Sequence, residues 1–293
     1  MSDGPGPSTP PPPSPPPSPG ASELSLRILS ALLMAPVAIG ATIAGGIAFG
    51  LLVACVSALA FAEWNAIVTG RAADKVVVVA CGLIALSVVL MAMGAPVRAI
   101  LTGGVAWILV GGRASLTSDP ERRGWLILGP LYALLPGLAM VLLRGSDALG
   151  LLAMLFLFAV VWGTDIAAYF SGRALGGPKL WPAVSPKKTW SGALGGLAAA
   201  VMLGAATVAW GRGGSIAPVM AVAALLSVAS QGGDLFESAL KRRFGVKDSG
   251  HVIPGHGGIL DRIDGLVAAA VLAVLIGALR AGFLAPAEGL VAW

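Results

Sequence analysis

The chain has 293 residues, of which 57% are hydrophobic and only 11% are charged, and its mean hydropathy is +0.88. Soluble globular proteins are about 25% charged, so this composition excludes a water-soluble domain, and the many apolar residues exclude a disordered chain. Nineteen Lys and Arg against fourteen Asp and Glu leave a net charge of +5. We therefore expect an all-α, polytopic integral membrane protein whose basic residues mark topology or bind phosphate.

The N-terminal residues 1–23 are expected to form a disordered Pro-rich tail. Residues 1–20 are low-complexity Pro, Ser and Gly sequence without an apolar face to bury. They also lack the basic segment joined to an apolar core that is typical of a signal peptide. A single transmembrane domain is predicted over 24–284, followed by a short C-terminal tail at 285–293.

Apolar runs predict nine membrane-spanning helices, since each crossing needs about 20 apolar residues. No charged residue lies between Arg27 and Glu63, which is enough chain for two helices with a break near Gly45-Gly46. Seven further runs complete the prediction: 76–97, 99–112, 124–143, 148–170, 189–211, 214–233 and 264–284. The run at 99–112 is the shortest and the weakest of them.

The distribution of basic residues supports this helix count. If the N-terminus and every loop after an even-numbered helix share one side, fifteen of the nineteen Lys and Arg residues fall on that side. Basic loops stay in the cytoplasm, so we expect a cytoplasmic N-terminus and a C-terminus on the opposite side.

Acidic residues gather at the predicted cytoplasmic boundary, where they are costly unless paired, coordinated or hydrated. They are Asp165 near the end of the sixth helix, Asp234 and Glu237 at the end of the eighth, and Asp261 and Asp264 at the start of the ninth. These positions are therefore functional candidates.

The spacing of these residues favours a metal and phosphate site. Asp234, Ser238 and Lys241 lie at i, i+4 and i+7, on one face of a helix that continues past the bilayer. Asp261 and Asp264 are neighbours at i and i+3. Carboxylates on two helices suit Mg²⁺ whose shell is completed by phosphate oxygens. The PGHGG segment at 254–258 adds flexible backbone whose N–H groups can approach an anion.

Each of these features also has a plainer interpretation. Lys241 and the two arginines after it can anchor the helix beside anionic lipid. Asp261 and Arg262 can form a structural ion pair, and His251 can be an ordinary loop residue. Tryptophans near helix ends are typical of an interfacial belt, which is the simplest interpretation of three of them: Trp64, Trp181 and Trp190.

Residues 238–264 read SALKRRFGVKDSGHVIPGHGGILDRID, which resembles the signature of the phosphatidate cytidylyltransferases, or CDP-diacylglycerol synthases. AEWN at 62–65, GTDIAAYFSGRALGG at 163–177, SPKKTW at 185–190 and SQGGDLFESALKR upstream of the signature also fit this family. The resemblance covers about 24–284. One departure is Ser191, where the family commonly has an acidic residue.

The resemblance implies transfer of the cytidylyl group of CTP to phosphatidic acid, giving CDP-diacylglycerol and pyrophosphate with Mg²⁺ as cofactor. It implies the bacterial inner membrane as location and the two substrates and the lipid bilayer as partners, with no nucleic acid and with a homodimer left open. It implies catalytic roles for Asp234, Asp261, Lys241, Lys247, Asp248 and His256, substrate binding by Asp165, Lys187, Lys188, Ser238, Arg242, Gly257, Gly258 and Arg262, and Mg²⁺ binding by Asp234, Asp261 and Asp264.

Three other functions compete with this reading. A transporter for an anionic solute favours internal repeats and broken helices at the midplane, whereas these charges gather at one face without a clear repeat. A CDP-alcohol phosphotransferase needs D-G-x-x-A-R, but Asp264-Gly265 is followed by LVAA. A CTP-dependent lipid kinase remains the closest alternative.

Overall fold

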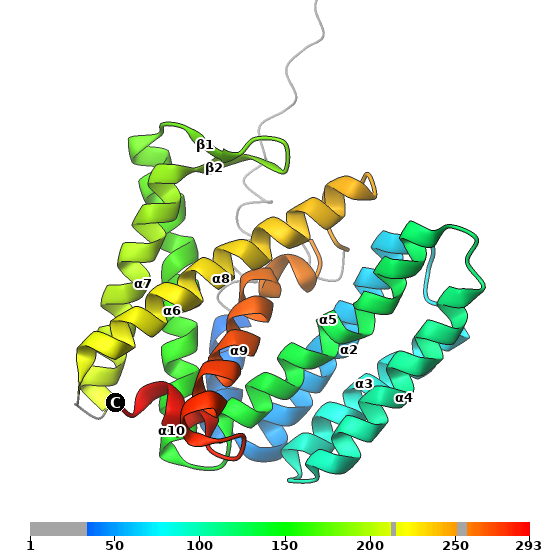
Figure 1. Cartoon of the computed structure of the whole chain (residues 1–293), viewed down its shortest axis with the longest axis horizontal. Helices are drawn as coiled ribbons and strands as arrows, with labels where there is room; N and C mark the ends of the chain where they lie inside the picture. The colour runs from blue at the N-terminus through cyan, green and yellow to red at the C-terminus, as the bar shows by residue number, and fades with distance from the viewer. Residues whose placement is uncertain (1–33, 212–214, 251–256) are drawn as a thin grey trace, which may run out of the picture.

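The computed structural model describes residues 34–211, 215–250 and 257–293 as a bundle of long helices (Figure 1). Eight of these helices are long and apolar enough to cross a membrane. They are α2 (Gly46–Thr69), α3 (Lys75–Ala92), α4 (Pro96–Ser115), α5 (Pro120–Arg144), α6 (Ala148–Leu175), α7 (Trp190–Gly211), α8 (Ile216–Arg243) and α9 (Leu260–Ala281). The predicted all-α membrane fold is confirmed.

The predicted break at Gly45-Gly46 is confirmed, but the count of nine spans is not. A shorter apolar helix, Met34–Ala44, precedes the break, and the structure describes only eight helices of spanning length within its three ranges. Gly45 has a φ of 64°, which disfavours any residue with a side chain. A Cβ there would also lie 2.6 Å from Nη2 of Arg144, whose Nε donates to the carbonyl of Thr42 at 2.6 Å. Arg144 therefore satisfies a carbonyl that the interrupted helix leaves free.

The weakest predicted span, 99–112, belongs to a full-length helix. Pro96 occupies the first turn of α4, where its missing N–H costs no hydrogen bond. The helix then continues to Ser115, past Arg113, which pairs with Asp74. The apolar run was short because charged residues lie on both end turns of the helix.

Small residues bring α6 and α7 into close contact. Gly192, Gly196 and Gly204 are buried on one face of α7. A Cβ at Gly196 would lie 2.8 Å from the carbonyl oxygen of Thr164 on α6. Such small-residue faces let helix backbones pack closely in a bilayer. The α6–α7 pair thus forms a tight support for the segment that joins the two helices.

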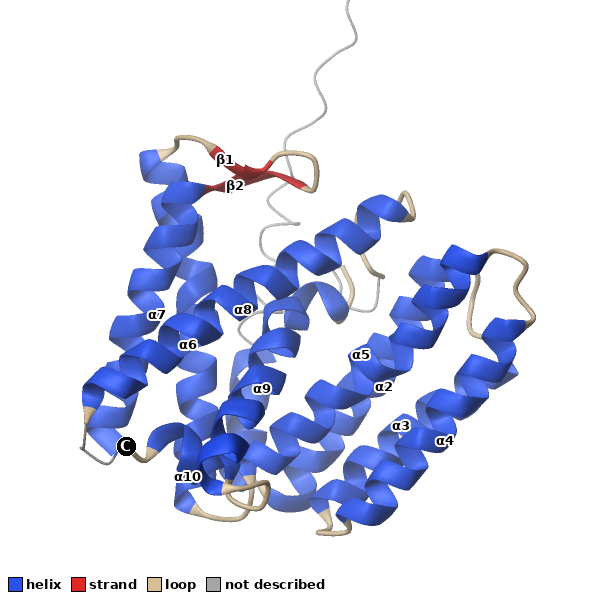
Figure 2. Ribbon diagram, viewed as in Figure 1, coloured by secondary structure: helices blue, strands red, loops and turns tan. Residues whose placement is uncertain are grey.

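That segment is a β-hairpin, which the sequence did not predict. Strands β1 (Lys179–Trp181) and β2 (Ser185–Thr189) pair antiparallel, with Lys179 opposite Thr189. Figure 2 shows these strands in red, projecting beyond the helices at one end of the described bundle. The pairing folds the chain back over the ends of α6 and α7.

Aromatic side chains fill the core between α2, α5 and α8. Trp64 is fully buried, and its Nε1 donates to the carbonyl of Trp125 at 2.8 Å. Its ring contacts those of Tyr132 and Phe236, with centroids 4.6 and 6.2 Å away. The interfacial-belt interpretation is therefore wrong for Trp64, because tertiary packing covers this helix end.

The helices alternate in direction, so the connections lie at two ends (Figure 1). The loops after α2, α4 and α8 lie at the same end as the β-hairpin, which we call the hairpin end. The other connections lie at the opposite end, together with the short helix α10 (Pro286–Val291), which occupies the segment assigned to a C-terminal tail. The predicted basic loops therefore share one end of the described bundle.

Candidate active site at the hairpin end

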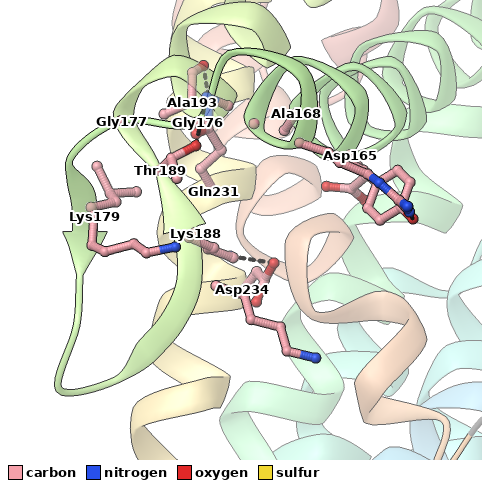
Figure 3. Close-up of a pocket in the computed structure, with 16 residues that line it drawn as sticks. Asp165, Ala168, Gly176, Gly177, Lys179, Lys188, Thr189, Ala193, Gln231 and Asp234 are labelled. Atoms are coloured by element: carbon pink, nitrogen blue, oxygen red, sulfur yellow. Dashed lines mark hydrogen bonds and ion pairs between the residues drawn. The ribbon is translucent and has the colours of Figure 1, made fainter. Parts of the chain in front are cut away.

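A cavity of about 560 Å³ opens at the hairpin end between α6, the β-hairpin, α7 and α8 (Figure 3). It brings together residues from the sixth, seventh and eighth predicted helices and from the connecting segment. Its polar and charged lining residues are Asp165, Tyr169, Arg173, Lys179, Lys187, Lys188, Thr189, Gln231 and Asp234. The cavity combines several cations with two carboxylates, as expected of a site for a phosphate compound and a metal ion.

Asp234 lies in this cavity and pairs with a lysine of the hairpin. Lys188 forms an ion pair with Oδ2 of Asp234, seen as a dashed line in Figure 3. The hydroxyl of Ser238, one turn further along α8, donates to Oδ1 of Asp234 at 3.4 Å. Both paired side chains are between a quarter and a third exposed, at 28% and 29%. A pair this accessible to water is weak enough for a charged ligand to separate it.

A second charged group lies further along α8. Nζ of Lys241 is 2.7 Å from Oε2 of Glu237 and 2.5 Å from Oδ1 of Asp261. The three side chains are 13%, 1% and 9% exposed, respectively. One ammonium group therefore neutralises two buried carboxylates, and we call these three residues the ion triad. The predicted continuation of α8 past Asp234 is confirmed, because α8 runs to Arg243.

The other oxygen of Asp261 holds the segment before α9. Its Oδ2 accepts the backbone N–H groups of Ser249 and Gly258 and the hydroxyl of Ser249, each at 2.9 Å. At Gly257, where φ is +81°, a Cβ would lie 2.6 Å from this oxygen. Gly257 and Gly258 thus pack closely against the carboxylate of Asp261, and the predicted approach of this segment to a phosphate stays a prediction.

Asp264, in the first turns of α9, interacts with acidic residues of both the cavity and the ion triad. It interacts electrostatically with Asp234, Glu237 and Asp165, and its Oδ1 accepts the N–H of Gly265 at 2.8 Å. Helices α8 and α9 touch here, since a Cβ on Gly233 would lie 2.4 Å from the carbonyl oxygen of Asp264. The acidic residues of the sixth, eighth and ninth predicted helices thus form one electrostatic neighbourhood.

The remaining predicted site residues are distributed around this neighbourhood. Lys187 lines the cavity with Lys188. The other four that the structure describes are exposed at the hairpin end: Arg242, Lys247, Asp248 and Arg262. His256 lies outside the described residues, as does His251.

The sequence-based prediction gave no site role to two acidic residues, Glu63 and Glu237, although it placed Glu237 among the candidate acids at the cytoplasmic boundary. Glu63, at the hairpin end of α2, is buried and accepts the N–H groups of Ile259 and Leu260 at 2.8 and 2.9 Å. Glu237 completes the ion triad and is almost fully buried. The signal for Glu63 was its position as the first charge after a long apolar run within AEWN, but its partner lies almost 200 residues away, beyond the reach of any local pattern.

The donor set is compatible with Mg²⁺ bound jointly by protein and substrate. Across the described ranges, no three His, Cys, Asp or Glu side chains are grouped so that they could hold a metal ion by themselves. Mg²⁺ usually takes only one or two carboxylates and completes its shell with water and substrate phosphates. Asp234 and Asp261 each direct an oxygen to a lysine ammonium group. Asp234 lines the cavity and fits such a site, whereas Asp261 does not line it and both of its oxygens contact protein groups in this structure.

Known proteins resemble the chain over nearly all of its length. The model of the cytidylyltransferase family matches residues 25–279. A protein of Brucella suis named phosphatidate cytidylyltransferase is 46% identical over 264 residues, which cover 89% of this chain and 95% of the relative. A Pseudomonas aeruginosa protein of the same name is 38% identical over 273 residues, covering 90% of this chain and all of the relative. A Bacillus subtilis protein, also so named, is 42% identical over 147 residues, or 49% of this chain and 54% of the relative.

Proposed function

The chain belongs to the cytidylyltransferase family, and we infer that it transfers the cytidylyl group of CTP to phosphatidic acid, giving CDP-diacylglycerol and pyrophosphate. It is an integral membrane enzyme that supplies phospholipid biosynthesis. The observation that carries this conclusion is the cavity at the hairpin end, where lysines and carboxylates from separate helices meet within the matched region.

The chemistry demands charge neutralisation more than proton transfer. A phosphate monoester has its second pKa near ~6, so the phosphate of phosphatidic acid is largely dianionic at neutral pH. One of its oxygens attacks the α-phosphorus of CTP, forming a P–O bond while the bond to the pyrophosphate oxygen breaks. A strong general base is therefore unnecessary, and positioning and electrostatics dominate such a reaction.

The lysines of the cavity provide this neutralisation. Lys187 and Lys188 lie on β2 and line the cavity between α6, α7 and α8, where triphosphate oxygens can replace the carboxylate that Lys188 contacts. Asp165 faces the same cavity from α6 (Figure 3) and gives it a second carboxylate for orienting bound cations. The hairpin thus carries the groups that balance charge on the leaving pyrophosphate.

Asp234 and Asp261 would hold Mg²⁺, with Asp264 as their acidic neighbour. The metal ion would supply Lewis-acid stabilisation of charge on the phosphate oxygens. What favours this assignment is that each of the two carboxylates contacts a lysine ammonium group, Lys188 or Lys241. With Mg²⁺ bound to these carboxylates, Lys188 and Lys241 would be available to contact phosphate.

Labelled CTP distinguishes the proposed reaction from its rivals. We expect detergent-purified protein, given phosphatidic acid and Mg²⁺, to carry label from [α-³²P]CTP into the lipid fraction and to release label from [γ-³²P]CTP as pyrophosphate. Lipid labelled from the γ-phosphate would identify a lipid kinase instead. Absence of labelled lipid from both substrates, with protein that stays folded, would contradict both enzyme functions and favour a transporter.

The hairpin end is proposed to face the cytoplasm of a bacterial inner membrane, with the N-terminus on that side. The basic loops at this end support the orientation, and CTP is a cytoplasmic compound. In a variant whose Cys55 and Cys81 are replaced by Ala, we expect Ala183→Cys in the hairpin turn to be shielded from an impermeant thiol reagent in intact cells, and Glu288→Cys on α10 to be labelled. Both positions are exposed in the structure. The opposite labelling pattern would contradict the orientation, and a homodimer remains a separate prediction.

A further inference from the structure

We propose that Glu63 is a positioning residue for this reaction: from α2 it holds both ends of the segment between Ser249 and Leu260 and thereby sets the carboxylate of Asp261. The inference rests on the proposed function, since it concerns how that site is kept in order. Glu63 belongs to helix α2, which contributes no residue to the lining of the cavity.

Glu63 caps α9 from another helix. The N-cap position of α9, Ile259, has no side-chain cap of its own. Instead, Oε1 of Glu63 accepts the N–H of Ile259 at 2.8 Å, and Oε2 accepts the N–H of Leu260 at 2.9 Å. The first N–H groups of a helix lack partners within it, and its N-terminus favours a negative charge. A buried carboxylate from α2 meets both requirements at the point where α9 begins.

The same carboxylate contacts the chain before the segment 251–256. The hydroxyl of Ser249 lies 2.9 Å from Oε2 of Glu63. A Cβ on Gly250 would lie 2.9 Å from Oε1 of Glu63, and one on Gly258 would lie 2.4 Å from Oε2. Glu63 therefore packs against glycine backbone on both sides of the segment, where larger residues would displace it.

Ser249 connects this cap to the proposed metal ligand. Its hydroxyl is 2.9 Å from Oε2 of Glu63 and also 2.9 Å from Oδ2 of Asp261. Asp261 in turn contacts Lys241, the central cation of the ion triad. A continuous set of contacts thus runs from Glu63 through Ser249 and Asp261 to Lys241. Displacements of about 1 Å in a catalytic group can cost about a hundredfold in rate, so a loosened cap is expected to reduce turnover.

The isosteric variant Glu63→Gln tests this role. Its amide keeps one acceptor oxygen but replaces the other by a donor, so one N–H group of α9 loses its acceptor. We expect kcat to fall at least about tenfold, whereas the KM for CTP changes less than about threefold, because the cavity lysines are untouched. Hydrogen exchange at the amides of Ile259 and Leu260 is expected to accelerate, which reports the cap independently of activity.

Asp147→Ala is the matched control. Asp147 caps α6 at the opposite end by accepting the N–H of Gly150 at 2.7 Å. This variant also removes a carboxylate cap, so its thermal stability should fall, but its kcat should stay within about twofold of wild type. A second comparison uses Ser249→Ala, which we expect to be non-additive with Glu63→Gln in kcat, because both act on Asp261.

The outcomes separate this inference from the proposed function. If Glu63→Gln keeps wild-type kcat while its melting temperature falls as in Asp147→Ala, Glu63 is only structural and the inference is wrong. Unchanged exchange at Ile259 and Leu260 would also overturn it, whatever the activity. If wild-type protein transfers no α-phosphate label to lipid, the proposed reaction is wrong. Faster exchange in Glu63→Gln would then still show that Glu63 caps α9, but the cap would have no role in that reaction.

Discussion

Asp234→Asn is expected to reduce turnover by at least ~10³-fold, about 4 kcal/mol of transition-state stabilisation, and to raise the Mg²⁺ concentration needed for half-maximal rate. Asparagine keeps the shape of the side chain but removes a negative charge, and with it the proposed metal ligand, from the cavity. It also leaves Lys188 without its ion-pair partner. Since the cavity lysines remain, CTP binding should suffer less than turnover.

The measurement is the initial rate against Mg²⁺ concentration, made on variant protein that elutes as a single species in detergent. Asp119→Asn is a suitable control, because Asp119 caps α5 at the hairpin end by accepting the N–H groups of Glu121 and Arg122. This control should keep wild-type turnover and Mg²⁺ dependence. Wild-type values for Asp234→Asn as well would place the metal site elsewhere.

Lys241→Met is expected to give the largest loss of stability. Removing the ammonium group leaves Glu237 and Asp261 as two buried carboxylates without their shared cation. Breaking a buried ion pair in this way costs about 3–5 kcal/mol. We expect low yield and a much lower melting temperature in detergent. Thermal unfolding followed by circular dichroism provides the measurement.

Two comparisons show whether the ion triad causes that loss. Arg243→Met removes a neighbouring cation whose pair with Glu121 is exposed, at 57% and 50% for the two side chains, so it should lower the melting temperature far less than Lys241→Met. The double variant Lys241→Met with Glu237→Gln should recover part of the stability, because one unpaired carboxylate is gone. Equal melting temperatures for Lys241→Met and Arg243→Met would contradict the buried triad.

The features that the sequence predicted are local ones. Apolar runs located all eight helices of spanning length in the described residues and the break at Gly45, because helix length and hydrophobicity depend on neighbours in the chain. The common face of Asp234, Ser238 and Lys241 followed from helical spacing, and α8 continues far enough for it. Sequence and structure agree on these features because each depends only on residues within a few turns of one helix.

The features that the sequence missed depend on contacts between distant segments. The β-hairpin is short and Lys-rich, so no apolar alternation marks its strands, and the support of α6 and α7 stabilises it. Trp64 lies at a helix end, yet packing against α5 and α8 buries it. Glu63 caps a helix that begins almost 200 residues later, and such a pairing leaves no periodic signal. Tertiary packing decides these positions.

The guanidinium of Arg144 is buried, so its N–H groups contact backbone carbonyls of the protein and are not available to lipid headgroups. Arg144 is one of only four basic residues assigned to the far side, yet it is 7% exposed and its N–H groups bind the carbonyls of Thr42 and Ile43. Arg280, another of the four, donates to the carbonyl of Ala292 and stacks 3.2 Å from the ring centroid of Trp293. In the folded protein, lipid headgroups at that end therefore meet fewer unoccupied guanidinium N–H groups than residue counts indicate.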